Sequence, residues 1–583
     1  MKKNLVKMLV CFWLLSQLLA ACVPTDAARI KSLAARVAGA LPAQWPEGSA
    51  VEVIIRQRPE PDEMAENQIL KVGVSSLIGL DPVLNYSTSS MFHNILYVGL
   101  TRQYPNTLEF LPALAERWQV SEDQLTWTFT LRANIPWVAY NSKTKQVEKV
   151  TDKDGKTQFV TAEDVRSNIL RVLALANTTW QKKLLLNIKN ASEYSQNSAK
   201  DQIIGVEAKD DQTLVFTLNE PIPAFDAIVE LPFFSPSPDR LLELIDIDEK
   251  VAKSLVNTYG YGPFVSKSFT INKTAVVVRN PFWQSIDAVP TPLLSEIQFS
   301  VVASNNNLSR FNDGVIDVIQ LTQSEYKMHL ANSGKTNTLH LVDGICPIYL
   351  GFKNLDLKPF SDVNNRLALT YSINRSEIVE KIFSGTANEL GYFTFPRLRA
   401  GNDFGTISSV AFDTSKVKSL FNSTIWTEKS VDAPTMFILQ SEPEESIGIL
   451  ILNQVKTVLA RTLKANYPTI PNFSKTIGST KFPSVFITSA CAHYADVEDL
   501  WQQMLWNNES DQKEVEELRQ QVLENKVTND RAAAYLQLND ALIDKNAVII
   551  PLVTPSQIWL VGEEVRGDLL PLYQQFENWW IAK

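Results

Sequence analysis

The sequence has few of the residues on which enzymes and metal centres most often depend. Only four histidines and four cysteines occur in 583 residues, and neither set has the spacing of a zinc site. Glycine is sparse, at 21 residues, and there is no glycine-rich phosphate loop, GxSxG elbow or HExxH motif. We therefore expect a protein that is not an enzyme, without catalytic residues, metal or cofactor. A Ser/His/Asp triad assembled from distant residues stays open as the alternative, because its partners need not be close in sequence.

The chain also lacks an excess of positive charge. It carries 55 Lys and Arg against 64 Asp and Glu, a formal net charge of −9. A nucleic-acid partner requires a basic face, and docking on anionic lipid requires a polybasic patch. We therefore expect neither a nucleic-acid partner nor electrostatic docking on anionic lipid. The 45% apolar and 20% charged content is that of a globular protein. A chain of this length is too long to fold around a single hydrophobic core, so two or more lobes are expected.

Only one long apolar run is present, and it lies at the N-terminus. Lys2, Lys3 and Lys7 lead into Met8–Ala21, which is too short to span a bilayer comfortably. The run ends in LAAC at Cys22, which resembles a bacterial lipoprotein lipobox. The resemblance implies cleavage before Cys22, lipidation of its thiol and a membrane anchor. The alternative is an ordinary signal peptide with a chance cysteine.

Two further features concern the tether and the remaining cysteines. Residues 23–66 are predicted to be a spacer, with helical spacing over residues 28–41. Cys346 and Cys491 could form a disulfide in an exported protein. Two buried free thiols are the interpretation that we prefer for this pair.

Hydrophobic periodicity alternates between strand and helix types along the rest of the chain. The region 138–160 is polar and is interpreted as an exposed hairpin or insertion. Helices are predicted from a capping-box-like start at Thr161, at 364–383 with a restart near Asn374, at 450–463, and twice within 511–544. Strands are predicted at 69–74, 125–132, 213–219, 348–352, 482–488 and 548–553, the last broken by Pro551. The segments 125–132 and 213–219 alternate alike and should share one antiparallel sheet. The mixture indicates an α/β or α+β body of two lobes, perhaps with an added subdomain.

A series of short segments carries a more specific signal. They are LPALAERW at 111–118, which leads into the 125–132 strand, TAEDV at 161–165, GYGPF at 260–264, NPFW at 280–283, DGVID at 313–317, LGFKN at 350–354, VNNRLA at 363–368 and INR at 373–375. Together, and in this order, they resemble the family 5 extracellular solute-binding proteins of ABC importers. That family includes oligopeptide and dipeptide binders, and the resemblance covers about residues 69 to 567.

The resemblance implies an α/β, periplasmic-binding-protein-like fold with two large lobes, two hinge strands and an inserted subdomain. The ligand would be enclosed between the lobes by hinge closure. The partners would be a small solute and the permease subunits of an importer, and we expect a monomer. The implied segments are 67–110, 205–325 and 548–583 for lobe I, 111–204 for the inserted lobe II, and 326–547 for lobe III.

The resemblance also points to a ligand site. The run HYADVED at 493–499 is similar to a stretch in which peptide-binding members hold a peptide's α-ammonium with a buried aspartate, and Asp496 falls on that aspartate. The alternative for Asp496 is a loop acid that caps a helix. We assign as candidate ligand contacts Asp496, His493, Tyr494, Trp501, Tyr261 and Trp137.

The sequence departs from the family pattern at His493, Val497, Glu498 and Asn374. These departures affect the ligand class and not the fold. A small peptide is the expected ligand. An oligosaccharide, a metal complex or a non-transport surface-binding role stay as alternatives.

Overall fold

We describe a computed structural model of the chain. The described residues are 58–81, 93–104, 109–175, 179–197, 204–236, 238, 259–286, 288–302, 306–332, 338–393, 398–400, 410–426, 434–507, 517, 528–570 and 574–583. The signal segment with Cys22, the helical pattern at 28–41 and the first expected helix of 511–544 lie outside them. No helix within these ranges has the length and hydropathy needed to cross a membrane.

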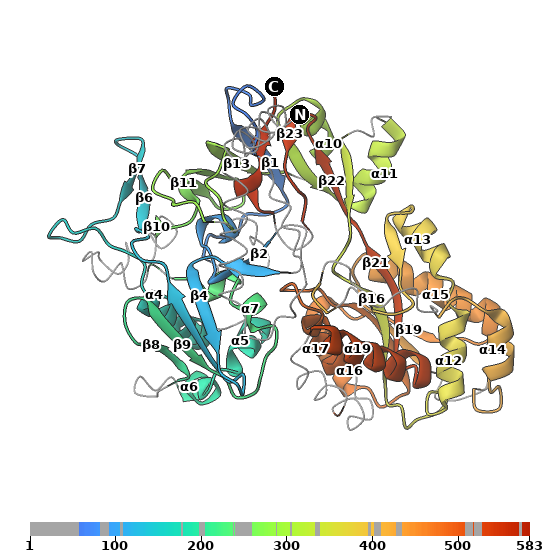
Figure 1. Cartoon of the computed structure of the whole chain (residues 1–583). Helices are drawn as coiled ribbons and strands as arrows, with labels where there is room; N and C mark the ends of the chain where they lie inside the picture. Colours follow the sequence, from blue (N-terminus) through green and yellow to red (C-terminus); the bar gives the residue numbers. More distant parts are fainter. Residues whose placement is uncertain are drawn as a thin grey trace, which may run out of the picture.

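Three sheets organise the described residues into three lobes (Figure 1). Lobe I contains a seven-stranded sheet with helices α10 (Asn307–Asn312) and α11 (Gln323–Asn332). Its strand order is β11 (Phe264–Thr270), β12 (Thr274–Arg279), β13 (Glu296–Val301), β1 (Ile69–Val74), β14 (Val318–Leu321), β22 (Gln557–Val561) and β15 (Leu339–Val342). Strand β1 runs parallel to both neighbours, whereas β22 runs antiparallel to β14 and β15. The expected first strand is therefore confirmed at the sheet's centre.

Lobe II is a four-stranded antiparallel sheet covered by α4 (Ala162–Leu175), α5 (Thr179–Leu186) and α6 (Ala191–Asn197). The strand order is β4 (Ala115–Val120), β5 (Thr126–Leu131), β9 (Thr213–Thr217) and β8 (Val206–Ala208). The predicted pairing of the two alternating segments is confirmed, since Trp127 lies opposite Phe216. Helix α4 starts as predicted, because Asp164 accepts the backbone N–H of Thr161 at 2.8 Å.

The polar region 138–160 forms the exposed hairpin that its composition predicts. Its strands β6 (Val138–Asn141) and β7 (Gln146–Lys149) pair with each other, and β6 also pairs with β10 (Tyr259–Gly260). In Figure 1 the hairpin projects from the left side of the molecule, away from lobe III.

Lobe III contains a six-stranded mixed sheet of order β17 (Ala387–Glu389), β21 (Ile549–Pro555), β16 (Ile348–Lys353), β20 (Ser484–Ser489), β18 (Thr435–Ile438) and β19 (Lys464–Asn466). Its helices are α12 (Val363–Ser372), α13 (Arg375–Phe383), α14 (Thr414–Leu420), α15 (Glu444–Leu459), α16 (Phe473–Ser479), α17 (Val497–Asn507) and α19 (Thr528–Asn539), which continues into a π-helical turn at Asp540–Lys545. The expected restart near Asn374 is confirmed, because the Asn374 side chain accepts the N–H of Glu377 and caps α13.

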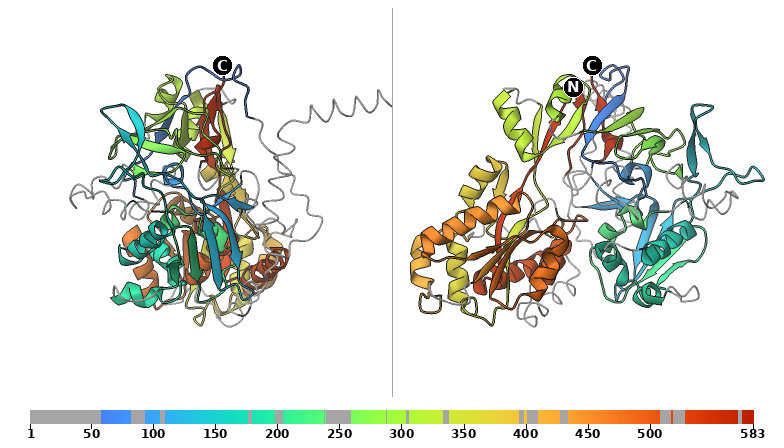
Figure 2. Two further views of the ribbon diagram at one scale, coloured as in Figure 1. Left: turned by 60° about the vertical axis from the view of Figure 1, so that its left-hand side comes forward. Right: turned by 180° about the vertical axis from the view of Figure 1, so that it is seen from behind.

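Two chain crossings join lobe I to lobe III. One runs from β15 to β16 and the other from β21 to β22, and each places one strand in the sheet of each lobe. The crossings lie against each other at Gly344, where a Cβ atom would overlap the carbonyl oxygen of Pro555. Lobes II and III lie side by side below lobe I, and the C-terminus lies at the lobe I end (Figures 1 and 2).

The structure corrects two expectations from the sequence. Cys346 and Cys491 form a disulfide with a Cα–Cα distance of 4.1 Å, so the preferred assignment of two buried free thiols is wrong. Pro551 does not break its strand, because β21 continues to Pro555 and the irregularity is absorbed as a register shift beside Tyr349.

The sheets also fall differently from the lobe segments that the resemblance implies. Strands β8 and β9 follow residue 204 but complete the lobe II sheet, so we extend the proposed subdomain to Thr217. Strand β15 belongs to the lobe I sheet and β21 to the lobe III sheet. We therefore place the proposed crossings at residues 343–347 and at Ser556.

Candidate ligand-binding site at the lobe junction

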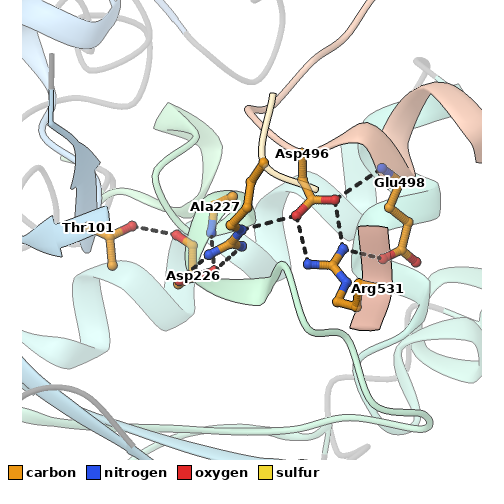
Figure 3. Close-up of polar contacts among 7 residues, drawn as sticks. Thr101, Asp226, Ala227, Asp496, Glu498 and Arg531 are labelled. Atoms are coloured by element: carbon orange, nitrogen blue, oxygen red, sulfur yellow. Dashed lines mark hydrogen bonds and ion pairs between the residues drawn. The ribbon is translucent and has the colours of Figure 1, made fainter. Parts of the chain in front are cut away.

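Asp496 lies in the connection between β20 and α17, at the face that lobe III turns toward lobes I and II (Figure 3). Its side chain is fully buried. The Asp496 Oδ1 atom accepts the backbone N–H of Glu498 at 3.0 Å in the first turn of α17. The alternative reading of Asp496 as a helix-capping acid therefore describes one of its contacts.

Two arginines take up the rest of the Asp496 carboxylate. Arg531 of α19 donates from Nη2 to Oδ1 at 2.8 Å and from Nη1 to Oδ2 at 3.1 Å. Arg399 donates from Nε to Oδ2 at 3.1 Å. A carboxylate offers about four lone-pair positions, and with the Glu498 N–H these four bonds fill them. In this conformation Asp496 has no acceptor position left for a ligand ammonium.

Arg399 connects Asp496 to the opposite side of the junction. Its backbone belongs to lobe III, because its N–H donates to the Ala495 carbonyl and its carbonyl accepts from Val497, both at 3.1 Å. Its guanidinium reaches across to Asp226 of the short helix α7 (Phe225–Ile228), donating from Nη1 at 2.8 Å and from Nη2 at 2.6 Å. This bidentate geometry is the strongest that arginine makes with a carboxylate.

The Arg399–Asp226 pair is supported on the lobe I side. The guanidinium carbon of Arg399 lies 5.1 Å from the ring centroid of Phe110 in β3 (Phe110–Pro112). Thr101 of β2 (Thr101–Gln103), which pairs with β3, donates to the backbone carbonyl of Asp226 at 2.6 Å (Figure 3). The side chains of Arg399 and Asp226 are 14% and 15% exposed, whereas that of Asp496 is not exposed at all. Of the two carboxylates that bond to Arg399, Asp226 is therefore the one that solvent can reach.

The charges of the cluster hold each other in the ionised state. Burial alone would raise the pKa of Asp496, but the charges of Arg531 and Arg399 and the hydrogen bonds from Arg531 and Glu498 bring it below its usual value. The arginine pKa values rise despite burial, that of Arg399 because of Asp226 and that of Arg531 because of Asp496. All three groups are charged at neutral pH.

Glu109 faces the same cluster, but its pKa is shifted in the direction opposite to that of Asp496. Its pKa is raised mainly by burial, and the nearby Asp226 carboxylate adds to the rise while Arg399 works against it. The cluster therefore combines acids from both sides of the junction, and Arg399 is the cation placed between them.

The segment that carries Asp496 is fixed at several points. The Cys346–Cys491 disulfide ties it to the β15–β16 crossing. His493, whose side chain is 23% exposed, places Nδ1 3.1 Å from the Asp499 carboxylate. Gln503 donates to the Cys491 carbonyl at 2.9 Å. The Asp496 segment is therefore linked covalently to this crossing.

Tyr494 and Trp501 lie beside Asp496 but are almost completely buried. Burial, together with the charges of Asp499, Glu498 and Asp496, raises the pKa of the Tyr494 phenol well above its usual value, so it stays protonated. Trp501 packs edge-on against Phe393, with ring centroids 5.4 Å apart, and Phe393 packs in turn against Tyr349 of β16. In this conformation both residues are part of the hydrophobic core and offer little surface to a ligand.

Tyr261 and Trp137 lie in a different cluster. Their ring centroids are 5.3 Å apart at an angle of 85°, and the Tyr261 hydroxyl donates to the Val98 carbonyl at 2.8 Å. Both side chains are buried, with exposed fractions of 0% and 1%. The structure thus brings His493, Tyr494, Asp496 and Trp501 together and keeps Tyr261 and Trp137 apart from them.

Sequence reasoning missed the three residues that complete the site: Arg399, Arg531 and Asp226. Arg531 lies in a stretch that reads as an ordinary acidic-basic helix, and nothing local distinguishes Arg399. Asp226 carried a weak signal, as a single acid inside the apolar run AFDAIV at 224–229. Within the part of the chain that the structure describes, no group of three or more His, Cys, Asp or Glu residues could hold a metal ion.

Comparison with known proteins agrees with this architecture. The model of the bacterial extracellular solute-binding proteins, family 5, matches residues 109–504, more than half of the chain. The dipeptide-binding protein DppE of Bacillus subtilis is 25% identical over 502 residues, which cover 84% of this chain and 86% of that protein. The periplasmic oligopeptide-binding protein OppA of Salmonella typhimurium is 27% identical over 279 residues, or 46% of each chain.

Solved structures show the same fold. The murein tripeptide-binding protein MppA in its unliganded open form has a TM-score of 0.71 at 21% identity, over 90% of this chain and 99% of that one. OppA of Haemophilus influenzae in complex with the peptide RPPGFSPFR has a TM-score of 0.63 at 19% identity, over 89% of this chain and all of that one. On this evidence the chain belongs to the bacterial extracellular solute-binding proteins of family 5, which are exported binding proteins.

Proposed function

We propose that this protein captures a small peptide between lobe III and lobes I and II, and delivers it to the permease subunits of an ABC importer. The observation that carries this proposal is the pair of crossings at residues 343–347 and Ser556, which join the two sides. We propose that these two segments act as the hinge. A ligand that contacts both sides binds the closed form better and shifts the population toward it. The peptide-binding relatives DppE and OppA support the ligand class.

The site proposal centres on the Asp496 segment. Asp496 supplies the negative charge for the peptide's α-ammonium, His493 offers a partly exposed ring, and Tyr494 and Trp501 hold the segment in place. Tyr261 and Trp137 stay in the proposal as residues that shape the wall of lobes I and II. Because four bonds already fill the Asp496 carboxylate, an ammonium reaches it only by exchange with one of them.

Native mass spectrometry of the gently purified chain from residue 23 onward tests the function. A removable adduct with peptide masses, lost on unfolding and regained on refolding with peptide, is the expected result. Asp496→Asn should then weaken rebinding, and the exposed Glu116→Gln should not. A sugar or metal-complex adduct would keep the binding protein and discard the peptide. No adduct, together with no change in tryptophan fluorescence across peptide and sugar panels, would leave a surface-binding role.

The proposed location is the outer face of a membrane, with the protein held by lipid on Cys22 and acting as a monomer without catalytic activity. The lipobox-like LAAC segment supports the anchor. Cys22→Ser should move the protein from the detergent-rich to the aqueous phase in a Triton X-114 partition. Unchanged partition would exclude lipidation at this cysteine.

A further inference from the structure

The junction contains two carboxylates from opposite sides with one cation between them. Asp226 comes from α7 beside lobe I, Asp496 comes from lobe III, and the Arg399 guanidinium bonds to both. Among the residues that the structure describes, Asp226 is ion-paired with Arg399, while Asp496 is also held by Arg531. The two carboxylates therefore form a site for a cationic hydrogen-bond donor, and the chain fills it with its own side chain.

The formal charges indicate how strongly this site requires a cation. Among the ion-paired groups, Asp226, Asp496 and Glu498 supply three negative charges against the two of Arg399 and Arg531, and Glu498 lies 3.7 Å from Arg531. Glu109 is a further acid that faces the same cluster. Withdrawing Arg399 would leave two carboxylates facing each other at the junction with one guanidinium remaining. Leaving a buried charge unpaired is among the most costly changes in a protein interior, so a replacement cation would bind there readily.

Exchange of Arg399 requires no movement of its backbone. The backbone is fixed to Ala495 and Val497, and only the flexible side chain spans the junction. Asp226 and the Arg399 side chain are each partly exposed, so an incoming group can approach the outer carboxylate first. An ammonium is a compact donor of three N–H groups, which suits the space between two carboxylates.

We propose that Asp226 and Asp496 together form a two-sided cation site for the ligand's ammonium group, and that Arg399 occupies this site until the ligand displaces it. This inference rests on the proposed peptide function and extends it. It adds Asp226 to the ligand-binding residues, and it makes Arg399 the residue that sets how strongly a free amino terminus is preferred. Because Arg399 competes for the site, the wild-type protein discriminates only weakly between peptides with free and blocked amino termini.

The test uses the chain from residue 23 onward and a mixed short-peptide library prepared in two forms, with free and with N-acetylated amino termini. Native mass spectrometry gives the ratio of bound free to bound acetylated peptide. Arg399→Ala should raise this ratio on the order of tenfold or more, the value of one charge-assisted hydrogen bond. Arg399→Ala combined with Asp226→Asn should cancel the gain. Arg399→Lys, which keeps a cation but loses the bidentate pair with Asp226, should raise the ratio less than Arg399→Ala. The exposed control Arg117→Gln should leave the ratio unchanged.

An unchanged ratio in Arg399→Ala, or a gain that persists in the double variant, would overturn the proposal. If no variant binds any peptide, the proposed function fails, and the cation site is judged separately by thermal unfolding with methylammonium chloride. The Tm of Arg399→Ala should then be higher in methylammonium than in tetramethylammonium, which has no N–H donors. Methylammonium should not raise the Tm of the wild type. Equal effects of the two salts on Arg399→Ala would refute the site itself.

Discussion

Glu230, at the end of the segment that carries Asp226, is a buried acid whose charge opposes folding. Burial raises its pKa from 4.5 to about 7, while Arg102 and the backbone N–H of Gln103 act in the opposite direction and Glu577 and Asp226 add to the rise. The Gln103 N–H donates to Glu230 Oε1 at 2.9 Å. A glutamine can accept the same bond without a charge, so Glu230→Gln isolates the cost of ionisation.

The sign and the size of the effect follow from the pKa values. A carboxyl group whose pKa is higher in the folded than in the unfolded chain binds a proton on folding between these values. The stabilising contribution of this group is complete below about pH 4.5 and falls as the pH rises to about 7. A rise from 4.5 to about 7 makes the ionised form about 3 kcal/mol less favourable, at about 1.4 kcal/mol per pKa unit.

We therefore expect Glu230→Gln to stabilise the protein by up to about 3 kcal/mol at pH 8 and by close to zero at pH 4. Urea unfolding of the variant and of the wild type at both pH values measures the difference. Glu116→Gln, at an exposed site, is the control and should change stability by less than about 0.5 kcal/mol at either pH. Equal effects at pH 4 and pH 8, or a loss of stability at pH 8, would refute the reasoning.

Three further predictions concern the junction and the crossings. Arg531→Met removes a partner from the buried Asp496 and should destabilise lobe III by about 3–5 kcal/mol, whereas Arg166→Met, in a half-exposed pair with Glu163, should cost less than about 1 kcal/mol in the same urea titration. A cost for Arg531→Met as small as that of its control would contradict the ion-pair network. Replacing both Cys346 and Cys491 by serine should lower stability by about 2–4 kcal/mol. Peptide mapping of the wild type without reduction should recover the two linked peptides. Alkylation of both thiols in the native protein would exclude the bond. Gly344→Ala should cost about 1–3 kcal/mol of stability in thermal unfolding, because its Cβ would overlap the Pro555 carbonyl. The control Gly478→Ala, with open space around it, should be neutral. A neutral Gly344→Ala would mean that the crossings are not packed together as described.

The local elements of the fold could be predicted from the sequence. The alternation of Trp127, Phe129 and Leu131 identified β5, and the helical spacing of Val165, Ile169 and Val172 identified α4, because in each case the same side chains are buried. Such patterns can be read because burial sorts side chains at the period of the backbone. The ordered series of short segments indicated the family, and with it the hinged, multi-lobed arrangement.

The chemistry of the junction was decided by the tertiary structure alone. Asp496 was singled out from the sequence, but its partners Arg399 and Arg531 lie 97 and 35 residues away, and Asp226 lies 173 residues from Arg399. The same holds for Cys346 and Cys491, which are 145 residues apart and become neighbours only when β20 pairs with β16. Periodicity reports whether a side chain is buried, not which distant charge it meets. That depends on the path of the chain through both crossings, which no local pattern encodes.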